Sequence, residues 1–277
     1  MSMRINTNTQ SLNAQRMLRK SKSEQTSALQ RLSSGSRINS AADDAAGLAI
    51  SEKLKTEIRS SQQAYRNAGD GISLIQTTEG ALNETGSMLS RLKELSIQSA
   101  NDTLSDEERN YVNLEVQSII SEVDRIAKST DFNGRSLVDG NGDDFELQVG
   151  TKADPDSNRI TINTSDLDAT ADGLGLDSID VSSKSGARSA LEAVNEAQTK
   201  INGGRAILGS IQNRLSTTMT NLDQRATNLS AANARIRDTD FAAETAKLTQ
   251  ANIKTSAGVS VLTQANATPS AALGLLS

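Results

Sequence analysis

The chain of 277 residues contains no cysteine, no histidine and no tryptophan, and only 2% of its residues are aromatic. Without cysteine there is neither a disulfide framework nor a thiol nucleophile. Without histidine or cysteine the common zinc sites and the histidine general base are also excluded. So few aromatic rings argue against the thick core of a globular enzyme. We therefore expect a protein that is not an enzyme and that uses no metal and no cofactor.

Strong net charge and long apolar runs are also missing. The formal net charge is −5, and this mild acidity argues against non-specific binding of nucleic acid, which needs a basic surface. No stretch approaches the ~18 apolar residues of a membrane-spanning helix. Residues 1–18 lack the apolar core and small-residue cleavage site of a Sec signal peptide. The sequence thus predicts neither a nucleic-acid partner nor a membrane span.

Apolar residues recur at alternating steps of three and four between positions 194 and 236. A stripe of this kind that persists over about six heptads predicts a coiled-coil seam. Its main positions are Val194, Ile201, Leu208, Leu215, Leu222 and Leu229. If the helix begins near Ala187, its ~50 residues form a rod of roughly 75 Å, far longer than an ordinary globular helix.

Two more helices are expected before this rod. The first covers about residues 43–100, with an apolar seam that includes Tyr65, Leu82 and Leu89. The second begins at "SDEE", where Ser105 and Glu108 have the spacing of a capping box. Its seam is expected at Val112, Val116, Ile119, Val123 and Ile126. Since the three helices carry similar stripes, we expect them to form a bundle.

The segment between the bundle helices has a different pattern. Apolar residues alternate with polar ones at 145–149 and again at 160–162, and the residues between them are rich in turn formers. Period-two alternation on either side of a turn predicts a β-hairpin. This hairpin is too small to form a domain by itself.

Both ends of the chain carry weaker heptads, in which polar residues interrupt the apolar positions. The apolar members are Leu12, Leu18 and Leu32 near the start, and Phe241, Leu248, Val259 and Leu262 near the end. Isolated helices of this composition are marginally stable in water. We therefore expect each end to need a partner before it becomes ordered.

Several long motifs are similar to those of the bacterial flagellins. They include "INTNTQSLNAQRML", "LQRLSSGSRINSAADDAAGLAISEKL", "RLKELSIQSANDTLSDEERNYVNLEV", "FNGRSLVDG" and "NLSAANARIRDTDFAAETAKLTQANI". They occur in the order of the family and cover both ends and nearly all of the helical part. The chain resembles a minimal flagellin, because residues 140–185 leave no room for the outer variable domains of larger members.

The resemblance implies a mainly α fold, a long-helix coiled-coil bundle with a small β-hairpin element and paired terminal helices. The expected segments are an inner-core helix and spoke at 1–42, outer-core helices and hairpin at 43–185, the long outer-core helix at 186–237, and an inner-core helix at 238–277. In the spoke, Gly35 should end one helix, Asn39 or Ser40 should cap the next, and Asp43 and Asp44 should lie in its first turn.

The implied function is that of a structural subunit without catalysis, which polymerises into the helical flagellar filament used for swimming motility. The implied partners are further copies of the chain, a flagellar export chaperone, the filament cap and the hook-junction proteins. Export would follow the flagellar type III route, to the extracellular filament. From the residues alone, a coiled-coil signalling or adaptor protein is the alternative; the weak terminal seams favour the polymer.

The stretch "SRLKELSIQ" is similar to a flagellin patch that animal Toll-like receptors recognise. The matching positions are Arg91, Glu94, Leu95 and, on the next helix, Glu115. Lys93 replaces the more usual arginine of that patch. The same residues could instead form axial contacts between subunits, and both interpretations stay open.

Two acidic motifs receive a structural interpretation. The segment 139–150 begins like a calcium loop with Asp139, Asn141 and Asp143, but it lacks the turn glycine and the final glutamate. The group of Asp238, Asp240 and Glu244 is more typical of a helix cap, which Asp238 or Thr239 would provide.

Overall fold

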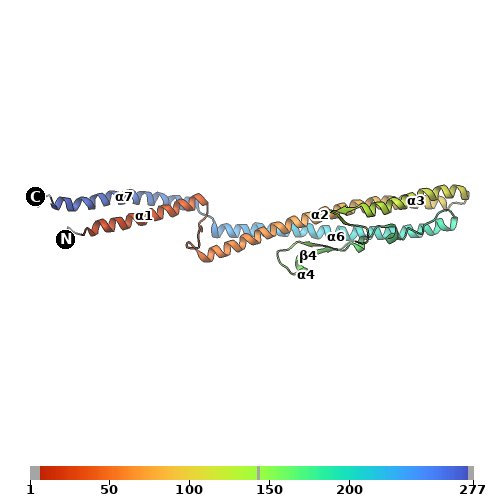
Figure 1. Ribbon diagram of the computed structural model, residues 1–277, viewed down its shortest axis with the longest axis horizontal. Helices are drawn as coiled ribbons and strands as arrows, with labels where there is room; N and C mark the ends of the chain where they lie inside the picture. Colours follow the sequence, from red (N-terminus) through yellow and green to blue (C-terminus); the bar gives the residue numbers. More distant parts are fainter. Residues whose placement is uncertain (1–6, 142–143, 274–277) are drawn as a thin grey trace. The chain divides into compact units, whose positions relative to one another are not determined.

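The computed structural model describes residues 7–141 and 144–273, and the fold is mainly α, as the sequence predicts (Figure 1). The helices in this part of the chain are α1 (Thr9–Ser34), α2 (Ala45–Ser99), α3 (Asp106–Ser129), α4 (Pro155–Asn158), α5 (Ala171–Leu174), α6 (Lys184–Arg237) and α7 (Phe241–Leu273). Contacts divide the chain into two compact units: a terminal unit of residues 1–57 and 227–277, and a central unit of residues 58–226. The four-segment division expected above stays a prediction.

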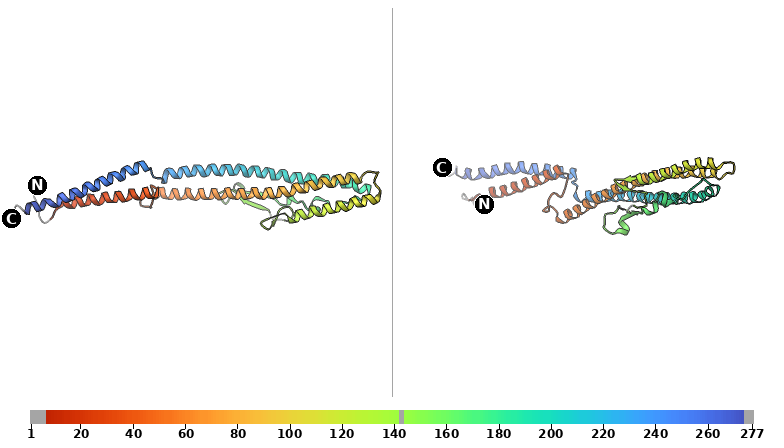
Figure 2. Two further views of the ribbon diagram at one scale, coloured as in Figure 1. Left: turned by 90° about the horizontal axis from the view of Figure 1, so that it is seen from above. Right: turned by 45° about the vertical axis from the view of Figure 1, so that its right-hand side comes forward.

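In the terminal unit, α1 and α7 lie side by side and run antiparallel, as both further views also show (Figure 2). The helix α1 ends at Gly35, whose φ of 67° is left-handed backbone that glycine adopts without strain. The next helix is capped by Asp44, whose Oδ1 accepts a hydrogen bond of 2.8 Å from the Gly47 amide. The predictions that Asn39 or Ser40 caps this helix and that Asp43 and Asp44 lie in its first turn were wrong, because α2 begins only at Ala45 and these residues precede it.

The central unit is built on α2, α3 and α6. Within this unit α2 buries one residue at alternating steps of three and four from Ser61 to Ser99, and α6 does the same from Ala187 to Leu215. The expected Tyr65 lies outside the seam and is 41% exposed, because Ala64 takes the buried position instead. Ser105 and Glu108 form the predicted capping box at the start of α3.

The seam of α3 differs from the expected one towards its end. Val116 and Val123 are buried as predicted, whereas Ile119 and Ile126 are only half-buried. Ile120 and Ala127 take the buried positions in their place. The spacing of seven residues was correct. Ile119 is followed by the apolar Ile120, and Ile126 by the apolar Ala127, so the pattern did not define which residue of each pair faces inward.

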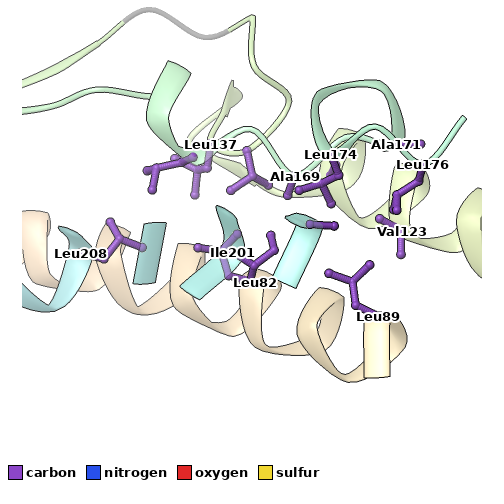
Figure 3. Close-up of a cluster of buried hydrophobic side chains, with 14 of the residues drawn as sticks. Leu82, Leu89, Val123, Leu137, Ala169, Ala171, Leu174, Leu176, Ile201 and Leu208 are labelled. Atoms are coloured by element: carbon purple, nitrogen blue, oxygen red, sulfur yellow. The ribbon is translucent and has the colours of Figure 1, made fainter. Parts of the chain in front are cut away.

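The predicted hairpin is formed by β3 (Phe145–Gln148) and β4 (Arg159–Ile162). Phe145 pairs with Ile162 and Leu147 with Ile160, in antiparallel register. A second hairpin pairs β1 (Asp131–Phe132) with β2 (Arg135–Ser136). Figure 3 shows how the segments that follow β2 and β4 cover the helices: Leu137, Ala169 and Leu174 face Leu82 and Ile201.

Candidate assembly surfaces

The contact between α1 and α7 consists mainly of small and polar residues. Ser21 and Ala28 of α1 and Ala251 of α7 are buried in it. A Cβ atom on Gly258 would lie 3.4 Å from Leu18 Cδ1, so the two helices pack closely at this point. A seam of this composition removes little apolar surface from water, and the hydrophobic stabilisation of the pair is correspondingly small.

Side-chain hydrogen bonds link the two helices along their length. Gln25 Nε2 donates to Asn252 Oδ1 at 2.7 Å, and Ser11 Oγ donates to Asn266 Oδ1 at 2.7 Å. Glu24 and Lys254 form an ion pair at 3.6 Å. Polar pairs in a helical seam contribute less to stability than to the choice of register, so these contacts define how α1 and α7 align.

The predicted terminal seam residues divide into two groups. Leu18, Leu32, Leu248 and Leu262 are half-buried. Leu12, Phe241 and Val259 are at least half exposed on the single chain. On α7 the contact to α1 passes through buried Glu244, Ala251 and Ala265, and half-buried Leu248 and Leu262 lie on the same face of the helix. As contacts between copies of the chain, all seven residues stay predictions.

The α7 helix exposes large apolar residues on several sides. The exposed set on the two terminal helices is Leu12, Met17, Leu29, Phe241, Ile253, Val259 and Val261. Since Ile253, Val259 and Val261 differ in helical angle, the apolar surface of α7 is not confined to the stripe that meets α1. A helix that is apolar around its circumference is normally buried among other helices.

Hydroxyl groups on α7 are bonded within the helix itself. Thr245 donates to the Phe241 carbonyl at 2.8 Å, Thr255 to the Ala251 carbonyl at 2.8 Å and Thr263 to the Val259 carbonyl at 3.0 Å. Such bonds to the carbonyl four residues earlier are an ordinary alternative to solvent for threonine in a helix. The hydroxyl donors of these three threonines are therefore satisfied within α7.

The predicted seam of the long α6 helix is buried over most of its length. Val194, Ile201, Leu208, Leu215 and Leu222 are all buried. The sixth position, Leu229, is half-buried and lies in the terminal unit. The neighbouring helix α2 supplies buried Leu82 and Leu89 to the same core. Sequence reasoning missed the polar members of the α2 seam, since Ser61, Thr78 and Thr85 are buried as well.

The patch similar to a receptor-binding site is organised by Arg91. Its Nη2 lies 2.9 Å from Glu115 Oε1, and its Nη1 lies 3.1 Å from Glu94 Oε2. Hydrogen bonds to Glu115 and then Glu94 raise the pKa of the Arg91 guanidinium above its usual value. Leu95 is only 2% exposed and belongs to the core. Its side chain therefore offers a receptor almost no surface, whereas the exposed apolar residues of this region are Ile97, Tyr111 and Leu114.

The acidic motifs hold no metal-like arrangement in the part of the chain that is described. There, no group of three or more histidine, cysteine, aspartate or glutamate residues could hold a metal ion. Asp143 lies outside the described residues. Asp240 Oδ1 caps α7 by accepting from the amides of Ala242 and Ala243 at 2.9 and 3.1 Å, so the prediction of Asp238 or Thr239 as the cap was wrong.

None of the described helices is long and apolar enough to cross a membrane.

Two family models match the chain. Residues 5–143 match the bacterial flagellin N-terminal helical region, and residues 191–276 match the bacterial flagellin C-terminal helical region. A flagellin of Halalkalibacterium halodurans is 43% identical over 274 residues, which are 99% of this chain and 100% of the relative. The flagellin of Bacillus subtilis is 38% identical over 306 residues, with 99% of this chain and 100% of the relative covered.

Solved structures agree with this relationship. The crystal structure of Bacillus cereus flagellin has 30% sequence identity and a TM-score of 0.50, and the match covers 61% of this chain and 94% of that structure. A putative flagellar hook-associated protein from Vibrio parahaemolyticus is similar in fold, with a TM-score of 0.60 and 14% identity over 71% of this chain and 100% of that one. The chain therefore belongs to the bacterial flagellin family, whose members are structural proteins of the flagellar filament and not enzymes.

Proposed function

We propose that this chain polymerises into the flagellar filament through its terminal unit. The observation that carries this proposal is the apolar surface of α7, of which α1 covers only one side. Further copies of the chain would bury this exposed apolar surface, because flagellins assemble with themselves. Head-to-tail contacts that do not close into a ring generate an open helical polymer. Such a filament serves as the propeller for swimming motility.

Leu12, Phe241 and Val259 are the proposed contacts between copies. Each is at least half exposed and apolar, so burying it between subunits removes apolar surface from water. Leu18, Leu32, Leu248 and Leu262 are proposed to continue these contacts from the edge of the α1–α7 seam. The α6 seam has a different role in this proposal: it stabilises the fold of the central unit.

A point substitution tests this surface. Val259→Asp places a carboxylate where the proposal needs an apolar contact, and we expect filament formation to be lost. Ser23→Asp introduces the same residue on the exposed side of α1, away from α7, and should leave filament formation intact. Sedimentation and electron microscopy measure the polymer, while circular dichroism confirms that both variants are folded. Equal polymerisation of the two variants would remove the basis of the proposal.

Transport and assembly partners belong to the same proposal. The chain would be secreted through the flagellar type III apparatus and would end in the extracellular filament. An export chaperone that covers the apolar faces of α7 before assembly would meet the physical need to keep them from aggregating. At the filament ends, the chain would contact the cap and the hook-junction proteins.

A second proposed activity is recognition of the α2–α3 patch by an animal Toll-like receptor. Arg91 is exposed, and its planar guanidinium can pair with carboxylates as it does with Glu115. Leu95 enters this proposal only as a residue that positions α2. A receptor-reporter assay with the soluble chain should lose most of its signal in Arg91→Ala. Arg125→Ala removes a comparable exposed arginine–glutamate pair on α3 and serves as the control; an unchanged signal from Arg91→Ala would exclude the site.

A further inference from the structure

The two interruptions in the helices of the terminal unit are hydrogen-bonded to each other. One interruption lies between α1 and α2, and the other between α6 and α7. The Arg37 amide donates to the Arg237 carbonyl at 2.6 Å, and the Thr239 amide donates to the Gly35 carbonyl at 3.0 Å. The Arg37 guanidinium also donates to the Ile236 carbonyl, at 2.7 Å, in the last turn of α6.

Arg31, in the last turn of α1, lies between two carboxylates, one from α7 and one from the turn before α2. Its Nη1 lies 3.6 Å from Glu244 Oε1, in the first turn of α7. Its Nη2 lies 3.7 Å from Asp43 Oδ1, in the turn that precedes α2. Glu244 is 5% exposed, so its ion pairs are less screened by solvent than those of a surface residue. Lys247, one turn further along α7, completes the group at 2.9 Å from Glu244.

The second oxygen of Asp43 holds the turn before α2. It accepts from the amides of Asn39 and Ser40 at 3.1 and 2.9 Å, and from the Ser40 hydroxyl at 3.0 Å. The hydrogen bonds from Ser40 lower the pKa of Asp43 below its usual value, with smaller contributions from Asn39 and Arg31. One guanidinium thus contacts both the carboxylate that shapes this turn and the carboxylate at the start of α7.

We infer that Arg31 is a positioning residue that couples the order of the turn at 39–43 to the docking of the first turn of α7. When α7 is docked, Glu244 fixes Arg31, and Arg31 orients Asp43 for the two backbone amides. When α7 is not docked on α1, Arg31 loses its contact with Glu244 and the turn at 39–43 is less ordered. The direction of the chain between α1 and α2 is then not fixed. The inference rests on the proposed polymerisation, because assembly is the step that covers α7.

Hydrogen exchange in the assembled full-length chain tests the coupling. Glu244→Gln keeps the shape of the side chain but removes its charge. We expect the amides of Asn39 and Ser40 to exchange roughly 5-fold faster or more, a change in the usual range for coupling between sites. Glu24→Gln removes another ion pair between α1 and α7, at 3.6 Å from Lys254, and should leave both amides at the wild-type rate.

The reciprocal variant covers the case in which Glu244→Gln does not assemble. Coupling free energies are reciprocal, so Asp43→Asn should speed exchange at the Ala242 and Ala243 amides by a similar factor. Wild-type exchange at residues 39–40 in Glu244→Gln, or at residues 242–243 in Asp43→Asn, would overturn the inference. Whether the wild-type chain forms filaments is scored separately by electron microscopy, and a failure there counts against the proposed function instead.

Discussion

The two units contain antiparallel helix pairs with the same alternation of steps of three and four, but the residues at those steps differ. Between α2 and α6 of the central unit the buried positions include Leu82, Leu89, Leu208 and Leu215. Between α1 and α7 they are residues such as Ser21, Ala28 and Ala251, while large apolar side chains of the same helices stay exposed.

This difference separates the tasks of folding and assembly. A buried leucine contributes a few kcal/mol to the stability of a fold, whereas a buried alanine or serine contributes far less. The central unit therefore holds the apolar surface that its own folding needs. The terminal unit keeps much of its apolar surface for contacts outside the chain, and small seam residues let its helices approach closely.

Removing either end should give the largest effect. A chain without residues 1–35, or one without residues 241–277, is expected to form no filaments, because α1 or α7 then lacks its partner. The central unit should remain folded, since its core does not include residues of α1 or α7. Electron microscopy and circular dichroism measure the two properties. Filaments of normal appearance from either truncated chain would break the division of tasks proposed above.

In the central unit, truncation of a single core leucine should greatly lower the free energy of unfolding. Leu215 is fully buried in the core, and we expect Leu215→Ala to lower the free energy of unfolding by roughly 2–5 kcal/mol. Ser216→Ala, on the exposed side of the same turn, should change it by no more than about 0.5 kcal/mol. Denaturant unfolding of a fragment spanning residues 45–237 gives both values. Equal losses would contradict the assignment of the seam.

The start of α3 offers a smaller test in the central unit. The Ser105 hydroxyl accepts from the Glu108 amide at 3.3 Å, and Glu108 Oε2 accepts from the Ser105 amide at 2.8 Å. Ser105→Ala should cost about 1 kcal/mol, as the loss of a helix cap usually does. The same denaturant measurement applies, with Thr103→Ala as a nearby exposed control. A loss as large as that of a core leucine would mean that Ser105 has a further role.

Leu18→Ala should have the smallest effect on the soluble chain, and this contrast with Leu215 is the sharpest test of the comparison. Leu18 is half-buried against Gly258, so we expect less than about 1 kcal/mol in the free energy of unfolding. The same substitution should raise the concentration of chain needed for polymerisation, which sedimentation measures. A large loss of stability without any effect on assembly would reverse the roles assigned to the two units.

Elements with a clear periodicity were predictable from the sequence. The α6 seam from Val194 to Leu222 follows from apolar residues at alternating steps of three and four. The pairing of β3 with β4 follows from the alternation of apolar and polar residues. The polar residues in the α2 seam were not predictable. The Thr78 hydroxyl donates to the Leu74 carbonyl at 2.9 Å, so this residue is buried with its donor satisfied inside its own helix. Residue type alone did not indicate its position.

The exact helix caps and the contacts between distant residues were also not predictable from the sequence. The capping roles of Asp44 and Asp240 depend on backbone geometry that several neighbouring residues could have provided. On α7 the apolar residues lie on several sides of the helix, so the small and polar residues that are buried against α1, such as Ala251 and Ala265, could not be singled out. Arg31 and Glu244 meet only because both terminal helices fold back on each other. No local pattern in the sequence records that pairing.

The hydroxyl groups of α7 have a consequence for the entropy of assembly. Thr245, Thr255 and Thr263 already donate to carbonyls of their own helix, so surrounding them with other chains leaves no donor without an acceptor. Short side chains of this kind also lose fewer rotamers on burial than lysine or glutamate would. Water can therefore be removed from these threonines at a small cost in hydrogen bonding and in side-chain freedom.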